Sequence, residues 1–259
     1  MKSSYIAMRW KGIKFLRMEK SVSEALQYRR AVRLFDPERP INPEEVRQCL
    51  QLATLAPNSS NLQLWEFHHV CAPSLKAKIA EYSFGQNAAK TADQFVVVVV
   101  RKDLWPQRAK WNIDSIKALQ LDAPPHLSDL RLREVIRYYD RLIPFLYFDI
   151  WGILGWIKWL FFAIVGLFRP VYREVTACDM RIVAHKSAAL AAQSFMLLMA
   201  ARGYDTCPME GIDTRRIRKL LRLPRSAEIN MVIACGIRTD KGIYGPRLRV
   251  PFSEVYRPW

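Results

Sequence analysis

The order of apolar and polar residues along the chain predicts a mixture of strands and helices. Residues 95–100 form an unbroken apolar run and residues 229–237 a mostly apolar one, which are typical of strands buried on both faces of a sheet. A further strand is expected over residues 65–71. Residues 179–202 are rich in alanine and carry apolar residues at helical spacing, so they predict a long helix that ends at Gly203.

Polar capping residues mark where other helices begin. Asn42 precedes a proline and two acids, so we expect a helix to start there and to stop near Pro57. Asp213 predicts a later helix start, and residues 206–211 before it are expected to form a loop. Residues 21–30 are also expected to be helical. This mixture predicts an α+β fold in which helices enclose a sheet.

The middle of the chain departs from this pattern. Residues 102–141 are polar and mostly helical in pattern, with breaks expected at Pro106 and at Pro124-Pro125. Residues 143–168 are then apolar apart from Asp149 and Lys158. An apolar run of this length is sufficient to cross a bilayer.

Composition describes a folded, basic protein. With 259 residues and 51% hydrophobic content the chain can bury a core, and we expect one domain over residues 21–259 after a basic amphipathic extension over residues 1–20. The net charge of +16 is compatible with several anionic partners, but no nucleic-acid-binding motif appears. The five cysteines form no C-x-x-C pair, which favours a cytoplasmic location, and the four histidines lack the spacing of a zinc site.

Arginines near the two ends of the chain are the candidate phosphate ligands. The sequence contains neither a G-x-G-x-x-G motif after a strand nor a P-loop, so a phosphate group would have to be held by side chains. Arginine suits this task because its guanidinium donates in a fork. Arg29 and Arg33 are four residues apart, so on a helical turn they would face the same way. The candidates are Arg29, Arg30 and Arg33, together with Arg247 and Arg249.

Four motifs in order resemble those of the FMN-dependent nitroreductase family. R-R-A-V-R-L-F-D at 29–36 is similar to the opening motif of the family, and A-P-N-S-S-N-L-Q-L-W at 56–65 is similar to its A-P-S-x-x-N-x-Q-P-W loop. G-Y-D-T-C-P-M-E-G at 203–211 is similar to its flavin loop, and R-L-R-V-P at 247–251 to its closing basic pair. The resemblance covers residues 21–101 and 176–256. Ala31, Asn58 and Leu64 depart from the family pattern.

The resemblance implies a mostly antiparallel central sheet sandwiched by helices, in an intertwined homodimer with two flavins at its interface. It implies that the arginines named above hold the FMN phosphate and the pyrimidine side of the ring. Residues of the second motif would reach a flavin bound mainly by the other subunit, and those of the third would pass along the isoalloxazine ring. These residues are Pro57, Asn58, Ser59 and Asn61, and Pro208, Met209, Glu210 and Gly211.

The activity implied by the resemblance is an FMN-dependent oxidoreductase that takes hydride from NADH or NADPH. By a ping-pong cycle it would reduce nitroaromatics, quinones or a related conjugated acceptor, with FMN supplying the redox chemistry. No side chain is needed as a catalytic acid or base. Two alternatives remain, because a fold does not determine a function. One is reductive dehalogenation or flavin fragmentation on the same fold, and the other is a membrane-associated binding protein without turnover.

The apolar segment lies within a variable region, about residues 102–175, that would cover the flavin. Because motifs on both sides of it belong to one site, both of its ends must lie on one side of any membrane. One hypothesis is therefore a hairpin over residues 143–168 that makes peripheral contact with the inner membrane face. Arginines flank this segment, and Trp151, Trp156 and Trp159 within it suit a membrane interface. The alternative is a lid, or an arm buried against the partner subunit.

Overall fold

The computed structural model describes residues 19–122, 129–150 and 152–259. The expected basic extension over residues 1–20 therefore lies outside the described residues except for its last two, and so does Trp151.

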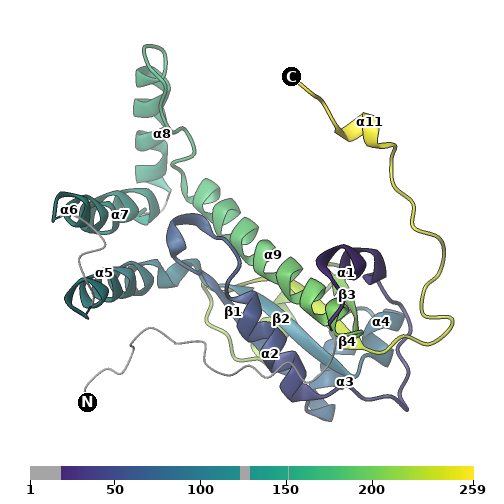
Figure 1. The fold of residues 1–259 in the computed structure, drawn as a ribbon. Helices are drawn as coiled ribbons and strands as arrows, with labels where there is room; N and C mark the ends of the chain where they lie inside the picture. Colours follow the sequence, from purple (N-terminus) through teal and green to yellow (C-terminus); the bar gives the residue numbers. More distant parts are fainter. Residues whose placement is uncertain (1–18, 123–128, 151) are drawn as a thin grey trace.

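An antiparallel sheet of four strands forms the centre of the fold (Figure 1). Its order is β1 (Trp65–Val70), β2 (Gln94–Val100), β4 (Glu228–Gly236) and β3 (Asp205–Met209), so β1 and β3 are the two edges. The strands predicted over residues 65–71, 95–100 and 229–237 are confirmed within one residue at each end. The loop predicted over residues 206–211 is wrong, because most of that segment forms β3 and pairs with β4.

Both faces of the sheet are covered by helices, because alternate side chains of β2 enter two separate cores. Val96, Val98 and Val100 lie in the core shared with α2 (Pro43–Ala53) and α9 (Ala177–Ala201). The intervening residues of β2 lie in the second core. That core also contains residues of α3 (Pro73–Tyr82), α4 (Asn87–Thr91) and α10 (Thr214–Leu220). The α+β sandwich expected from the sequence is therefore confirmed.

Capping residues determine where the long helix α9 begins and ends. Thr176 and Asp179 form a reciprocal capping box at its start. Gly203 follows its end with φ of +79°, a conformation that glycine adopts without strain. Among the described residues α9 is the one helix long and apolar enough to cross a membrane, but it packs on the sheet and on α2 and α1 (Val22–Tyr28), as a core helix does.

The variable region forms a helical subassembly beside β1. A short turn η2 (Lys102–Leu104) leads into α5 (Trp105–Asp122), and Pro106 lies in the first turn of this helix, so the break expected there is wrong. The break expected at Pro124-Pro125 lies outside the described residues. From residue 129 the chain forms α6 (Asp129–Arg137), the π-helical η3 (Tyr138–Leu142) and α7 (Ile143–Tyr147). The last helix of the region, α8 (Ile153–Val165), projects away from the body in Figure 1.

The C-terminal tail leaves the body as an extended chain that carries one short helix, α11 (Phe252–Val255) (Figure 1). Tail residues from Val250 to the end are exposed. A tail in this state has no partner surface within the described part of its own chain.

Candidate functional site

The first arginine motif runs as extended chain along the free edge of β3. Ala31 forms a parallel bridge with Thr206, and the amide of Val32 donates to the Thr206 carbonyl at 3.2 Å. Because α1 ends at Tyr28, Arg29 and Arg33 do not share a helical turn as expected. In extended chain, however, alternate residues also share a side, and Arg29, Ala31 and Arg33 all line one pocket. The first and third motifs therefore meet at this edge.

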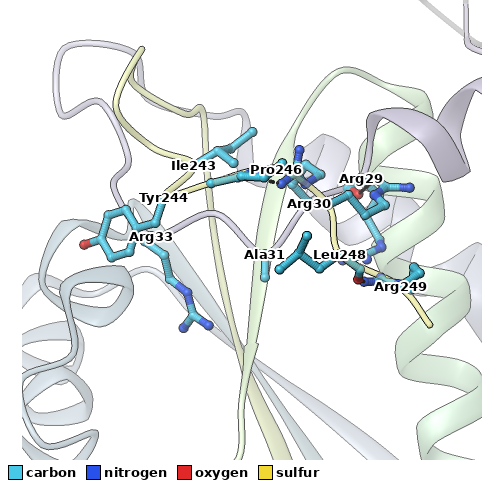
Figure 2. A pocket seen from close by; sticks show the side chains of 11 residues that line it. Arg29, Arg30, Ala31, Arg33, Ile243, Tyr244, Pro246, Leu248 and Arg249 are labelled. Carbon is cyan, nitrogen blue, oxygen red and sulfur yellow. Dashed lines mark hydrogen bonds between the residues drawn. The ribbon is translucent and has the colours of Figure 1, made fainter.

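This pocket, here called the arginine pocket, has a volume of about 250 Å³ (Figure 2). Its walls come from the first arginine motif and from the segment before the C-terminal tail, which are more than 200 residues apart in the chain. It is lined by Arg29, Arg30, Ala31, Arg33, Ile243, Tyr244, Gly245, Pro246, Arg247, Leu248 and Arg249.

Positive charge dominates the arginine pocket. Burial lowers the pKa of Arg29, and the neighbouring charges of Arg247, Arg249 and Arg30 lower it further. None of the lining residues is acidic. A cluster of arginines without a carboxylate repels itself, so its charge is complementary to an anionic group such as a phosphate.

The five predicted arginines play different parts in this pocket. Arg247 donates to the carbonyls of Leu26, Gln27 and Arg29 at 3.2, 2.9 and 2.6 Å, which satisfies the end of α1. Arg30 donates to the Gly245 carbonyl at 2.6 Å, and Arg249 donates to the Leu248 carbonyl at 2.6 Å.

The guanidinium groups of Arg29 and Arg33, by contrast, make no hydrogen bond or ion pair with the described part of the chain. In Figure 2 the guanidinium of Arg33 lies apart from those of Arg29 and Arg249. Their donors are therefore available to a ligand, whereas Arg247 and Arg30 hold the pocket walls together.

The third motif continues from β3 past its last residue. Met209 is 2% exposed and its side chain belongs to the second core, so only its backbone faces the strand edge. Glu210 and Gly211 are exposed, and Gln86 donates to the Gly211 carbonyl at 2.7 Å. Cys207 is buried, and burial raises the pKa of its thiol. Cys207 is therefore a core residue.

The second motif forms a tight turn before β1. Ser60, Asn61 and Gln63 have φ of 55°, 49° and 48°, the left-handed region that non-glycine residues rarely adopt. Tertiary contacts hold this conformation: the Ser60 hydroxyl lies 2.6 Å from that of Tyr138, and the Asn61 amide donates to Asn112 at 2.8 Å.

The predicted residues of the second motif lie within or beside this turn. Pro57 and Ser59 are exposed, and the Ser59 amide donates to the hydroxyl oxygen of Ser187 on α9 at 3.3 Å. Asn58 accepts from the backbone of Gln63 at 2.8 Å. The turn therefore presents Pro57, Ser59 and Asn61 to solvent on a rigid support.

The two halves of the predicted site lie at opposite edges of the sheet in one chain. The second motif precedes β1, whereas the arginine motif lies beyond β3. Four strand spacings separate β1 from the arginine segment, which corresponds to about 19 Å. The structure thus brings together the first, third and closing motifs, and it leaves the second motif apart from them.

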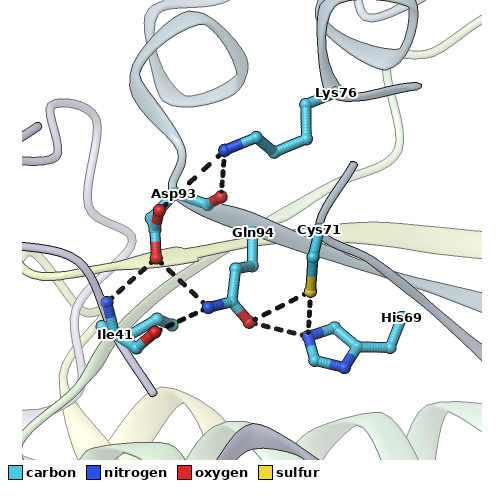
Figure 3. Close-up of polar contacts among 6 residues, drawn as sticks. All are labelled: Ile41, His69, Cys71, Lys76, Asp93 and Gln94. Atoms are coloured by element: carbon cyan, nitrogen blue, oxygen red, sulfur yellow. Dashed lines mark hydrogen bonds and ion pairs between the residues drawn. The ribbon is translucent and has the colours of Figure 1, made fainter. Parts of the chain in front are cut away.

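A second titratable cluster joins β1 and β2 to the chain before α2 (Figure 3). The amide nitrogen of Gln94 donates to the Ile41 carbonyl and to Asp93, so its oxygen accepts from Nε2 of His69 at 2.7 Å. Burial raises the pKa of the Cys71 thiol, which lies 3.3 Å from the same nitrogen. A protonated thiol beside a donor is a poor nucleophile, so this cluster is structural.

A shallow hollow of about 540 Å³ also lies beside β1, between the second motif and α5. Its walls include Gln63, Trp65, His68 and Arg108. Arg108 was not singled out from the sequence, because nothing in the pattern of α5 distinguishes it from other surface arginines. Tyr244, Gly245 and Pro246 of the arginine pocket were also missed, although Gly-Pro is a turn signal that places backbone at a surface.

Comparison with known proteins extends over most of the chain. The model of the Nitroreductase family matches residues 26–237. Protein DrgA of Synechocystis is 30% identical over 217 residues, which are 84% of each chain. A Staphylococcus haemolyticus protein named as an NAD(P)H nitroreductase is 27% identical over 91% of this chain and 89% of its own. A nitroreductase of Exiguobacterium sibiricum, solved in complex with FMN, is 22% identical with a TM-score of 0.66 and covers 94% of this chain and 99% of its own.

The antiparallel sheet between two helical layers, the motifs that meet at the edge of β3, and a family match over more than four fifths of the chain agree with one another. This protein belongs to the nitroreductase family.

Proposed function

We propose that this protein is an FMN-dependent oxidoreductase that uses NADH or NADPH to reduce nitroaromatics, quinones or a related conjugated acceptor. The active form is a homodimer with two flavin sites, each built from both subunits. The five cysteines are free thiols, which supports a reducing cytoplasmic location.

The arginine pocket is the observation that carries this proposal. It fits the phosphate end of FMN, because it combines crowded like charges with two guanidinium groups that have no protein partner in the described chain. A phosphate bound there would relieve the repulsion that lowers the pKa of Arg29. The arginine segment beside the pocket pairs with Thr206 of β3, and this strand leads to Glu210 and Gly211, where the third motif ends.

Each group of residues has a role in this arrangement. Arg29 and Arg33 would donate to the phosphate, and Arg30, Arg247 and Arg249 would shape the pocket and keep it cationic. Pro208 to Gly211 would line the ring, with Met209 contributing backbone alone. When bound, FMN supplies the hydride chemistry, and the protein supplies position and electrostatics.

The separation of the motifs supports a shared site. β1, which follows the turn that carries Pro57, Asn58, Ser59 and Asn61, lies about 19 Å from the arginine segment of the same chain. A separation of this size favours a site in which the turn and the arginine pocket come from different subunits. A two-fold dimer would place the turn of one subunit against the pocket of the other. The exposed C-terminal tail is then available to wrap around the partner.

Two relatives support the choice of cofactor and donor. The Exiguobacterium protein binds FMN in its solved structure, and the Staphylococcus protein carries NAD(P)H nitroreductase in its name. The names of these two relatives leave the acceptor open.

A flavin spectrum with a nucleotide titration tests the proposal. We expect the purified protein to be yellow, to bleach on addition of NADH or NADPH without oxygen, and to regain colour with a quinone or a nitroarene. Colourless protein that does not take up added FMN would support a binding protein without turnover. A stable yellow protein that neither nucleotide bleaches would instead support reductive dehalogenation or flavin fragmentation.

A further inference from the structure

The outer face of α8 is an uninterrupted apolar stripe. Ile153, Trp156, Ile157, Leu160, Phe161 and Ile164 follow each other at helical spacing of three and four residues, and each is between 53% and 71% exposed. Leu167 and Phe168 extend the stripe past the end of the helix and are 78% and 84% exposed. A solvent-facing helix of a globular protein normally has the opposite pattern, with polar residues outward.

Both charges of the apolar segment are turned inward, away from this stripe. Lys158 donates to the carbonyls of Phe145 and Phe148 at 2.9 and 3.1 Å, where α7 ends. Asp149 accepts from the amide of Gly155 at 3.1 Å, at the first turn of α8. Since each charge satisfies a helix end within the hairpin, the outer surface of α8 carries none. This arrangement removes the main cost of placing the segment in an apolar medium.

Basic residues lie on both sides of the segment that contains α7 and α8. Arg137 and Arg141 precede α7, Arg169 and Arg173 follow α8, and all four are exposed. Arg173 also donates to the Gly166 carbonyl at 2.9 Å, so it closes the end of α8. Trp156 and Trp159 pack edge to face at 5.5 Å on the outer side of the helix. Arginines and tryptophans in these places are typical of a protein segment at the boundary between lipid headgroups and acyl chains.

We propose that α8 is a monotopic membrane anchor that lies in the plane of an anionic bilayer, with its apolar stripe in the acyl boundary and its flanking arginines among the headgroups. The 13 residues of α8 span about 20 Å, which is shorter than the roughly 30 Å hydrocarbon core, so the helix does not cross the membrane. The net charge of +16 and the exposed arginines on either side of the hairpin are complementary to an anionic lipid surface.

The anchor also suggests the class of acceptor, and this step rests on the proposed oxidoreductase function. The hairpin belongs to the same helical subassembly as η3, whose Tyr138 contacts Ser60 of the second motif. A membrane surface bound by α8 would therefore lie near the part of the protein that completes the flavin site. We expect a lipophilic quinone dissolved in the bilayer to be reduced faster than its concentration in water would allow.

Vesicle binding by the full-length protein tests the anchor. We expect the protein to float with phosphatidylcholine vesicles that contain phosphatidylglycerol, with a blue shift of tryptophan emission, and to bind pure phosphatidylcholine less. Leu160→Glu should weaken this binding by at least about tenfold. Its matched control is Leu119→Glu on α5, where a leucine of similar exposure, 53% against 56%, gains the same charge and should retain full binding.

Three outcomes would overturn the anchor. The first is an absence of vesicle binding by the unaltered protein, and the second is equal vesicle binding by Leu160→Glu. The third is a change in oligomeric state in Leu160→Glu with vesicle binding intact, because that result would assign the apolar stripe to contact with a second copy of the chain. A long-chain quinone in vesicles and a short-chain quinone in water separate the two proposals. Leu160→Glu should no longer reduce the long-chain quinone in vesicles but should still reduce the short-chain quinone in water. If the unaltered protein reduces neither quinone, that result contradicts the oxidoreductase function alone.

Discussion

Arg29 is placed to bind a ligand, and this placement lowers the stability of the cofactor-free protein. It is half-buried, three other arginines surround it, and these causes together lower its pKa. A lowered pKa of a basic group means that its charged form is less favourable in the folded state than in the unfolded one. Arg29 therefore destabilises the cofactor-free fold slightly, and an anion in the pocket reverses that effect.

The first prediction separates these two effects. Arg29→Gln should weaken FMN binding by about tenfold or more, because a hydrogen bond to a charged group contributes about 1.5–3 kcal/mol. The same change should leave the melting temperature of the cofactor-free protein equal or slightly higher, because like-charge repulsion is relieved. Fluorescence titration of FMN and calorimetry of the apoprotein measure the two quantities.

Arg215→Gln is the control for this prediction. It also removes one positive charge, but from the exposed surface of α10, and it should leave FMN affinity unchanged. If both variants bind FMN equally, general charge and not the arginine pocket attracts the cofactor.

For single residues, the sequence predicted which side chains line the site better than it predicted the contacts that each of them makes. The five arginines were found because guanidinium groups bind phosphate, and all five line one pocket. That Arg247 would instead hold the carbonyls at the end of α1 depends on a contact between residues about 220 positions apart, which no local pattern records. Met209 was likewise named within a motif, although strand pairing turns its side chain into the core.

Among the elements, the hairpin of α7 and α8 depends most on one side chain. Lys158 joins the end of α7 to the middle of α8 through backbone carbonyls, and its ammonium lies 5.4 Å from the centre of the Phe145 ring. Few other polar contacts bridge the two helices in the described chain. The hairpin should therefore open when this ammonium is lost.

The second prediction concerns Lys158→Met, which retains the length of the side chain and removes its donors. The carbonyls at the end of α7 would lose their partner, at a cost of about 1–3 kcal/mol. We expect faster amide hydrogen exchange across α7 and α8, with unchanged exchange in the sheet. Lys110→Met on α5, where the side chain is 78% exposed, should change neither region. Uniform acceleration over the whole protein would contradict a local role.

Element boundaries followed local chemistry where such chemistry exists. Asn42, Thr176, Asp213 and Gly203 mark helix ends, and the first three cap them through their side chains. β3 was missed because its five residues include Pro208, and proline disfavours a strand. The strand forms because β4 pairs with it on one side and the arginine segment lies on the other.

For the molecule as a whole, the decisive feature is that one chain contains both halves of the predicted site but holds them apart. The order of the sheet places the arginine pocket at one edge and the second motif at the other. The sequence predicted this only through the resemblance to a dimeric family, because residue spacing contains no information about which chain completes a site. The apolar cover was recognised from hydropathy, but the inward orientation of its two charges required the structure.

The third prediction uses this separation. Arg29→Gln and Ser59→Asp each impair a different half of the site, and Ser59 is exposed, so its change should not disturb the fold. After the two variants are mixed and their subunits exchange, half of the dimers are mixed. Each mixed dimer regains one unaltered site, so about a quarter of wild-type activity should return.

Arg29→Gln mixed with Arg33→Gln is the matched control, because both changes affect the same half and no site is restored. Activity that does not return in the first mixture, with subunit exchange confirmed by mass spectrometry, would mean that each chain forms its site alone.

The hydrogen bonds from Arg247 to the carbonyls at the end of α1 also affect the order of folding. These bonds connect residues about 220 positions apart, and contacts of such long range form late because a large loop must close first. We therefore expect the sheet and α9 to be in place before the arginine pocket exists. FMN would then be captured by a nearly finished protein, and a chain released before its last residues are made would be folded in its core yet unable to retain its flavin.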